Sequence, residues 1–150
     1  MNVNGYVIEP GADLSGADLS NTKLLGLSFD GVILHGVNFK RADLEGADFK
    51  NAVVGGGWDI IELDICTYGP RFDGANLKDS DFSSACLYFT SFCGADVRGT
   101  NFSGVSFKFC YNPIADALDE GPDFTDAIYD QSTIWPDGEI PDGAIFKQAE

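Results

Sequence analysis

Large apolar residues recur at every fifth position over two long stretches of the chain. The first series begins at Leu14 and ends at Val54, and the second runs from Phe72 to Phe107. The residue two positions before each of them is mostly small or β-branched, and the residue two positions after is mostly Gly, Asn, Asp or Ser. A weaker series follows, with Phe124, Tyr129 and Ile134 as its large residues.

A period of five residues fits neither an α-helix, with about 3.6 residues per turn, nor a continuous strand, with about two. It fits short extended segments whose side chains alternate inward and outward, separated by a corner that resets the alternation. We expect the large residue (the central position) and the residue two before it (the inner partner position) to face inward. The residue types at the corner position are those that tolerate tight turns. The pattern therefore predicts a coil whose successive turns stack and pair their backbones.

Four of these units, residues 12–16, 17–21, 42–46 and 75–79, resemble the A-(D/N)-(L/F)-x-x motif of pentapeptide-repeat proteins. The resemblance implies an all-β fold, a right-handed quadrilateral β-helix of about five coils with about four pentapeptides in each. Periodicity alone does not distinguish four sides from three. The run from Tyr129 to Gly138 resembles the closing segment of many cyanobacterial pentapeptide-repeat proteins.

We expect residues 1–150 to form a single pentapeptide-repeat domain. Its repeats occupy residues 12–54, 70–109 and, less regularly, 122–136. Between the first two stretches lies an insertion, residues 55–69, which is too long for a corner and is rich in large apolar residues, among them Trp58, Ile60, Ile61 and Leu63. Two interpretations stay open for it: a loop that folds back on the coil, or a projection that binds a partner.

A second break separates the later repeats at residues 110–121. Asn112 followed by Pro113 is typical of a helix start, and Gly121 is typical of a helix end, so we expect a short helix over residues 113–119. The non-repetitive tail, residues 137–150, is expected to cap the last coil, because an open end would expose apolar side chains and unpaired backbone.

The chain is strongly acidic, with 24 Asp and Glu residues against 9 Lys and Arg and a formal net charge of −15. A protein that binds nucleic acid or an anionic membrane surface needs a basic face, so this balance argues against both classes. The chain also contains no apolar run of the ~18 residues that a membrane-spanning helix needs. We therefore expect no nucleic-acid partner and no membrane partner.

Some pentapeptide-repeat proteins resemble B-DNA in size and charge and act on DNA gyrase and other type II topoisomerases, so the resemblance keeps that role as an alternative. Such a mimic should spread negative charge along a long rod. Here residues 1–109 carry fourteen acids and eight bases, while residues 110–150 carry ten acids and one base. The acids are thus concentrated beyond the main repeats, which favours an ordinary solvated surface.

Aromatic residues at the corner position are the second unusual feature. Phe89 and Phe109 stand where small polar residues are expected, and they are twenty residues apart, so they should stack in a four-sided coil beside Tyr88. We expect the insertion or the tail to cover this aromatic corner, with a partner or dimer contact as the other interpretation.

Catalytic chemistry is not indicated. His35 follows a central position and is expected to point outward on a flat face, without the converging groups that catalysis needs. The cysteines, at positions 66, 86, 93 and 110, form no C-x-x-C pair, which argues against a zinc site. With neither a basic nor an apolar leader in residues 1–6, we expect free thiols in a reducing cytoplasm.

Together these observations predict a non-catalytic, cytoplasmic scaffold for protein–protein interaction, with no cofactor and no metal. Its partner is an unknown protein, and the chain itself is expected to be a monomer or a weak homodimer. The candidate interaction surface consists of Trp58, Ile60, Ile61, Leu63, Tyr88, Phe89 and Phe109.

Overall fold

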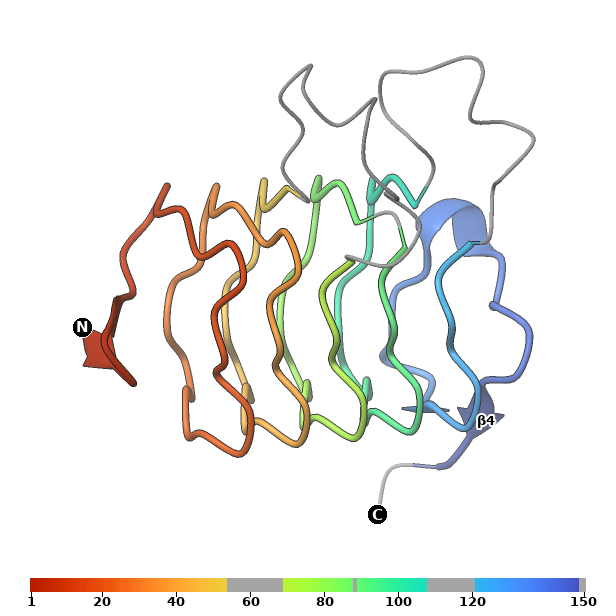
Figure 1. The fold of residues 1–150 in the computed structure, drawn as a ribbon. Coiled ribbons are helices and arrows are strands. Elements are labelled where there is room, and N and C mark those ends of the chain that lie inside the picture. Colours follow the sequence, from red (N-terminus) through yellow and green to blue (C-terminus); the bar gives the residue numbers. More distant parts are fainter. Residues whose placement is uncertain (54–68, 88, 108–120, 149–150) are drawn as a thin grey trace.

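The chain winds into a stack of coils, with the N-terminus at one end and the C-terminal coils, drawn in blue, at the other (Figure 1). The structure is a computed structural model, and it describes residues 1–53, 69–87, 89–107 and 121–148. Residues twenty apart pair in parallel, as Asp13 does with Ile33 and Asp18 with Asn38. Such pairs recur every five residues along the chain, so each coil has four five-residue sides and the pairs form four ladders. The predicted β-helix solenoid is confirmed.

Central positions fill the interior of the coils. Each of the following is at most 2% exposed: Leu14, Leu19, Leu24, Phe29, Leu34, Phe39, Leu44, Phe49, Phe72, Leu77, Phe82, Leu87, Phe92, Val97, Phe102 and Phe124. Because Leu and Phe largely alternate at successive central positions, the rings fall on two of the four sides. They form two stacked columns, with Phe29 on Phe49 at 4.6 Å between ring centroids and Phe39 on Phe72 at 5.0 Å.

The corners turn through left-handed backbone geometry. Every corner residue from 16 to 104 that the structure describes has a positive φ, whether it is glycine, as Gly16 at 70°, or not, as Arg41 at 54°. A hydrogen bond from the N–H of Ala17 to the carbonyl of Leu14, 2.9 Å long, closes the first of these corners. Positive φ at the third residue of such a turn is typical of the type II β-turn.

Both ends of the stack carry short strands. At the N-terminus β1 (Asn2–Val3) pairs antiparallel with β2 (Tyr6–Val7), and Ile8 joins the core. At the C-terminus β3 (Ile128–Tyr129) pairs in parallel with β4 (Ile145–Phe146), which extends one ladder. Between them η4 (Pro136–Gly138) is a short 3-10 turn. No helix in the described residues is long and apolar enough to cross a bilayer.

The ladders continue past both interruptions of the repeat. Asn38 pairs with Arg71 and Val53 with Cys86, so the offset grows from 20 to 33 residues across the insertion and then returns to 20. It grows again to 32 where Ser91 pairs with Asp123. The helix predicted over residues 113–119 lies outside the described residues, as does nearly all of the insertion 55–69. The handedness of the coil and the number of coils stay predictions.

One central position differs from the sequence-based expectation. Ile134, expected inside, pairs with Asn101 on the outside and is 50% exposed, whereas Trp135 is 8% exposed and stacks on Phe102 at 5.4 Å. The cause is one extra residue at the preceding corner. There the buried carboxylate of Asp130 accepts a hydrogen bond from the N–H of Ser132 at 2.9 Å, which holds a longer turn.

Candidate functional site

The Asp and Asn residues just before the central positions complete the hydrogen bonding of the backbone. The N–H groups of Leu14 and Gly16 donate to the next coil, but the N–H of Ser15 between them donates to Oδ1 of Asp13 at 2.9 Å. The same bond recurs at Asp18, Asn38, Asp48, Asn76, Asp81, Asp96, Asn101 and Asp123. These side chains accept a hydrogen bond from a backbone N–H that has no partner in the ladders. This explains the Asp or Asn in the repeated motif.

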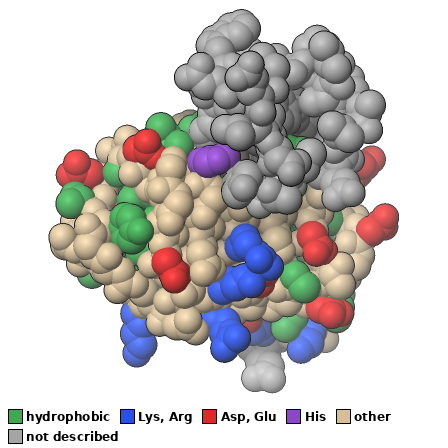
Figure 2. Space-filling model, in the orientation of Figure 1, with side chains coloured by type: hydrophobic (Ala, Val, Ile, Leu, Met, Phe, Trp, Pro, Cys, Tyr) green, Lys and Arg blue, Asp and Glu red, His purple; other side chains and the backbone are tan. Residues whose placement is uncertain are grey.

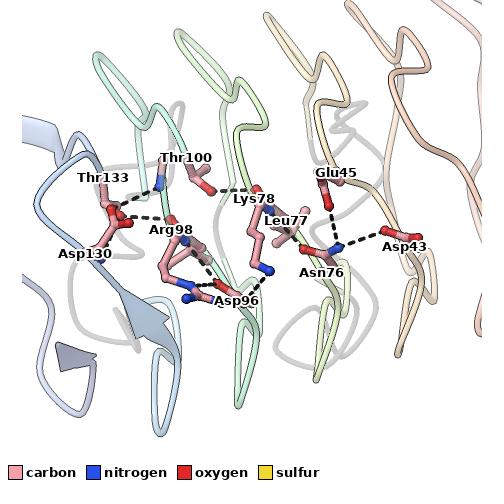
Figure 3. A network of polar contacts seen from close by, with 12 residues as sticks. Asp43, Glu45, Asn76, Leu77, Lys78, Asp96, Arg98, Thr100, Asp130 and Thr133 are labelled. Atoms are coloured by element: carbon pink, nitrogen blue, oxygen red, sulfur yellow. Dashed lines mark hydrogen bonds and ion pairs between the residues drawn. The ribbon is translucent and has the colours of Figure 1, made fainter. Parts of the chain in front are cut away.

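Asn at the same position also joins neighbouring coils. The Nδ2 group of Asn38 donates to Asp18 at 3.1 Å. Figure 3 shows the equivalent group of Asn76, which donates to Asp43 at 2.9 Å and to Glu45 at 3.1 Å. Asp residues repel one another when stacked, whereas Asp beside Asn makes a hydrogen bond. Sequence reasoning assigned these positions only as outward-facing, although the alternation of Asp and Asn at twenty-residue spacing is legible in the sequence.

Basic side chains on the sides of the solenoid pair with acids of their own or adjacent coils. Asp96 receives both Arg98, at 2.7 Å, and Lys78, at 3.6 Å, from the coil before it (Figure 3). Equivalent pairs join Lys40 and Arg71 to Asp73, and Lys50 to Asp48 and Asp81. In Figure 2 the Lys and Arg side chains gather on the lower part of the face shown. The sides thus carry charge of both signs, and five of their basic side chains are paired with acids.

Hydrogen bonding keeps these carboxylates ionised. The hydroxyl and N–H of Ser15 lower the pKa of Asp13, and those of Ser20 lower the pKa of Asp18. Burial alone would raise the pKa of Asp96, but the hydrogen bonds and charge of Arg98 outweigh it and lower the pKa. The outer polar positions therefore act as a stabilising lattice of charged acceptors.

The aromatic corner is described at one of its three residues. Phe89 occupies the corner with φ 51°, and its side chain is half-buried against the core. Gly69 stacks on it, because a Cβ on Gly69 would lie 1.9 Å from the carbonyl oxygen of Phe89. A bulky residue in left-handed geometry costs roughly 1–2 kcal/mol, so Phe89 is held there by its surroundings. Tyr88 and Phe109 lie outside the described residues, as do Trp58, Ile60, Ile61 and Leu63.

No cluster of three His, Cys, Asp or Glu side chains that could hold a metal ion occurs in the described part of the chain. His35 is half-buried just after the central residue Leu34, and its charge acts on Asp13, which belongs to the preceding coil. This placement agrees with the outer position that the repeat predicts.

The cysteines depart from the expectation that all thiols are free. Cys86 is in a disulfide, and Cys93 is free. Burial and the carboxylates of Asp123 and Asp73 raise the pKa of the Cys93 thiol, which keeps it in the less reactive protonated form at neutral pH. The expectation is therefore wrong for Cys86. The disulfide could not be read from the repeat, because the spacing of the cysteines in the repeat register does not indicate a bond at that position.

A solenoid of four-sided coils, built from five-residue units with a packed interior, defines a class of structural repeat protein. Within that class the family is given by the sequence: residues 12–51 and 69–99 match the family model for pentapeptide repeats in eight copies. The chain belongs to the pentapeptide-repeat proteins. Members of this family are generally structural repeat proteins rather than catalysts.

Solved structures of the same family resemble this one at low identity. Rfr23 from the cyanobacterium Cyanothece 51142 is 24% identical, with a TM-score of 0.41, over 82% of this chain and 63% of its own. The protein alr5209 from Nostoc Pcc 7120 is 21% identical, with a TM-score of 0.47, over 91% and 81%. A trypsin-treated form of QnrB1, a plasmid-mediated fluoroquinolone resistance protein, is 16% identical, with a TM-score of 0.36, over 91% and 78%.

The chain thus spans less than two thirds of the length of Rfr23. Among curated proteins, none matches it.

Proposed function

We propose that the protein is a non-catalytic scaffold that binds a protein partner through residues outside the ladders. Two features of the described coils support this role. Their interior is filled by stacked Leu and Phe side chains, so recognition falls to the surface. Five basic side chains on their sides are paired with acids of the same molecule, so we assign specificity to the segments that depart from the repeat.

The single observation that carries the proposal is the backbone of Phe89. Corners favour Gly, Asn, Asp and Ser, and an aromatic residue in left-handed geometry there costs stability. The repeat itself does not require an aromatic residue at this position. The chain re-enters the coil at Gly69, directly stacked on Phe89, so the insertion and the aromatic corner meet at one place. The proposed interaction surface is therefore the one expected from the sequence: Trp58, Ile60, Ile61, Leu63, Tyr88, Phe89 and Phe109.

Removal of residues 56–68 tests this surface. The variant lacks Trp58, Ile60, Ile61 and Leu63 together with the rest of the insertion. A second variant, Phe89→Gly, keeps the corner geometry but removes the ring. We expect both to lose a partner that the full chain captures and that also binds it as a purified protein. Leu25→Ala, at an exposed position of the sides, is the matched control and should bind normally. Recovery of the same partners by all three variants would contradict the proposal.

The alternative role, a DNA mimic that acts on DNA gyrase or another type II topoisomerase, is favoured by the net charge of −15. The ion pairs of Asp73, Asp81 and Asp96 weaken it, because a mimic of the phosphate backbone needs uncompensated charge along its sides. A gyrase supercoiling assay separates the two roles, since the scaffold should leave supercoiling unchanged at micromolar protein.

We also propose a cytoplasmic location and a monomeric or weakly dimeric state. The disulfide of Cys86 is the observation that opposes the first, because disulfides persist mainly in oxidising compartments. Sedimentation velocity tests the second.

A further inference from the structure

The C-terminal end of the solenoid closes with a strand that has an open edge. Within the described part of the chain, β4 has one neighbouring strand, β3. The N–H of Ile145 donates to the carbonyl of Ala127 at 2.7 Å, and the N–H of Lys147 donates to that of Tyr129 at 2.8 Å. Successive backbone groups of a strand point to opposite sides, so the N–H of Phe146 and the carbonyl of Ala144 point away from β3.

Exposed apolar side chains are frequent in the C-terminal segment that contains this edge. Seven large apolar residues of the described chain are exposed, and four of them lie in its last fifteen described residues: Ile134 at 50%, Ile140 at 53%, Ile145 at 42% and Phe146 at 53%. The ring of Phe146 packs edge-on against Tyr129, with centroids 5.5 Å apart, and Tyr129 packs against Trp135. Phe146 therefore continues the aromatic interior of the solenoid to its open end.

The same end is the acidic end of the described molecule. Residues 121–148 contain six acids and one base, Lys147. Asp137, Glu139 and Asp142 are exposed, and none of them forms an ion pair within the described residues. This contrasts with the sides, where the bases pair with acids. Figure 2 shows acidic side chains together with hydrophobic ones toward the right, where Figure 1 places the C-terminal coils.

We propose that this terminal edge binds a basic, extended segment of a partner protein, which adds to β4 as a further strand. The backbone of β4 supplies a donor and an acceptor, and Ile145 and Phe146 supply exposed apolar side chains on its two faces. The excess of acids over bases in residues 121–148 favours a basic sequence. The inference deepens the proposed scaffold role by adding a second binding surface of stated chemistry, separate from the insertion and the aromatic corner.

A second copy of this chain is a poorer occupant of the edge. Each copy carries a net charge of −15, and apposing two such ends would bring their uncompensated acids together. Like charges in apposition cost several kcal/mol and suppress association. A basic strand instead brings opposite charge to this acidic end while it pairs with the backbone of β4.

A labelled decapeptide of alternating lysine and valine is the probe, and the same peptide with glutamate in place of lysine is its control. We expect the basic peptide to bind the full chain at least about tenfold more tightly than the acidic one, with affinity that falls as salt rises. Phe146→Pro removes the outward N–H and should abolish this binding, whereas Phe146→Ala keeps that N–H and should retain part of it. Leu25→Ala should bind as the unchanged protein does.

Equal binding of the two peptides, or unchanged binding by Phe146→Pro, would overturn the proposal. If Phe146→Pro lowers the unfolding midpoint, amide chemical shifts of the unchanged protein decide: peptide-induced shifts confined to residues 127–129 and 144–147 support the site, and shifts elsewhere refute it. A dimer in sedimentation that Phe146→Pro dissociates would identify a second copy as the occupant and refute it too. Deletion of residues 56–68 should leave peptide binding intact, so failure here is distinguishable from failure of the scaffold role.

Discussion

Phe49 stacks on Phe82 with their ring centroids 4.6 Å apart and their planes parallel, although 33 residues separate them. Phe29 stacks on Phe49 at the same 4.6 Å across only 20 residues. The column of rings therefore has the same spacing across the insertion as in the coils before it. The packing of the core is unchanged where the chain leaves the coil between Val53 and Pro70, because the extra residues are added at a corner, outside the ladders.

This continuity predicts that the insertion is dispensable for folding. Deleting residues 56–68 removes thirteen residues, which returns the offset between paired residues from 33 to 20 and brings Gly69 to the corner after Val54. We expect cooperative unfolding, with a loss of no more than about 1 kcal/mol in the free energy of unfolding, because a shorter connection has a smaller entropic cost of closure. Urea unfolding measures this change in the free energy of unfolding. Both proteins are unfolded under reducing conditions, because the deletion also removes a cysteine, Cys66, and the comparison should not include any effect of a disulfide. A non-cooperative transition would show that the insertion is part of the core.

The ring columns predict a steep difference between inward and outward positions. Phe82→Ala should lower the free energy of unfolding by roughly 3–5 kcal/mol, because it opens a cavity between Phe49 and Phe102. Ser103→Ala, at an exposed position beside the same column, should change it by no more than about 0.5 kcal/mol. Denaturant midpoints that shift equally for the two variants would contradict the assignment.

Most of this core was predictable because the five-residue period fixes which side chains face inward. The central positions and the corners follow from residue type and spacing alone. The inward position of Trp135 could not be predicted in this way. The turn before it is one residue longer than the others and is held by a hydrogen bond to the Asp130 carboxylate, and such a local bond leaves no periodic signal in the sequence. The sequence likewise did not reveal the role of Asp and Asn as acceptors for the backbone, which depends on which N–H groups the ladder leaves over.

Candidate sites were less predictable for a related reason. Phe89 stood out because it breaks the pattern at a corner, and the structure places it there. The edge of β4 did not stand out, because Ile145 and Phe146 look like any short apolar pair until β3 lies beside them. A departure from a repeat can be seen in the sequence, whereas an open strand edge can be seen only in the folded structure.

Two glycines separate backbone strain from steric exclusion. Gly46 has φ 66° with open space where a Cβ would lie, so Gly46→Ala should cost roughly 1–2 kcal/mol through the left-handed backbone alone. Gly69→Ala should cost about 3 kcal/mol or more, because its Cβ would lie 1.9 Å from the carbonyl oxygen of Phe89 and the backbone must shift. Thermal unfolding of the two variants measures the difference. A smaller loss for Gly69→Ala would refute the close stacking of this corner.

Acid should destabilise the protein through its lattice of carboxylates. The pKa values of Asp13, Asp18, Asp96 and Asp123 are lowered in the folded state, so each group stabilises the fold fully above its unfolded pKa of about 3.9. That contribution is lost as the pH falls through the lower folded pKa values. We expect a constant urea midpoint between about pH 7 and 5 and a progressive fall below about pH 4.

Asp123→Asn is the variant that checks the cause of this acid sensitivity. Asn keeps an oxygen that can accept the N–H of Thr125 but does not titrate, so the fall in midpoint below about pH 4 should be smaller than in the unchanged protein. An identical fall would mean that other groups govern the acid transition.

Thiol labelling tests the assignment of the cysteines. In the protein purified without reductant, Cys86 should resist alkylation because it is in a disulfide, and it should label after reduction and unfolding. Cys93 should label in the folded protein, but slowly at neutral pH, because burial and nearby carboxylates raise its pKa and thiolate is the reactive form. Its labelling rate should rise with pH, because the thiolate forms only as the pH reaches the raised pKa of this thiol. Peptide mass spectrometry identifies the labelled positions, and ready alkylation of Cys86 without reductant would refute the disulfide and remove the objection to a reducing compartment.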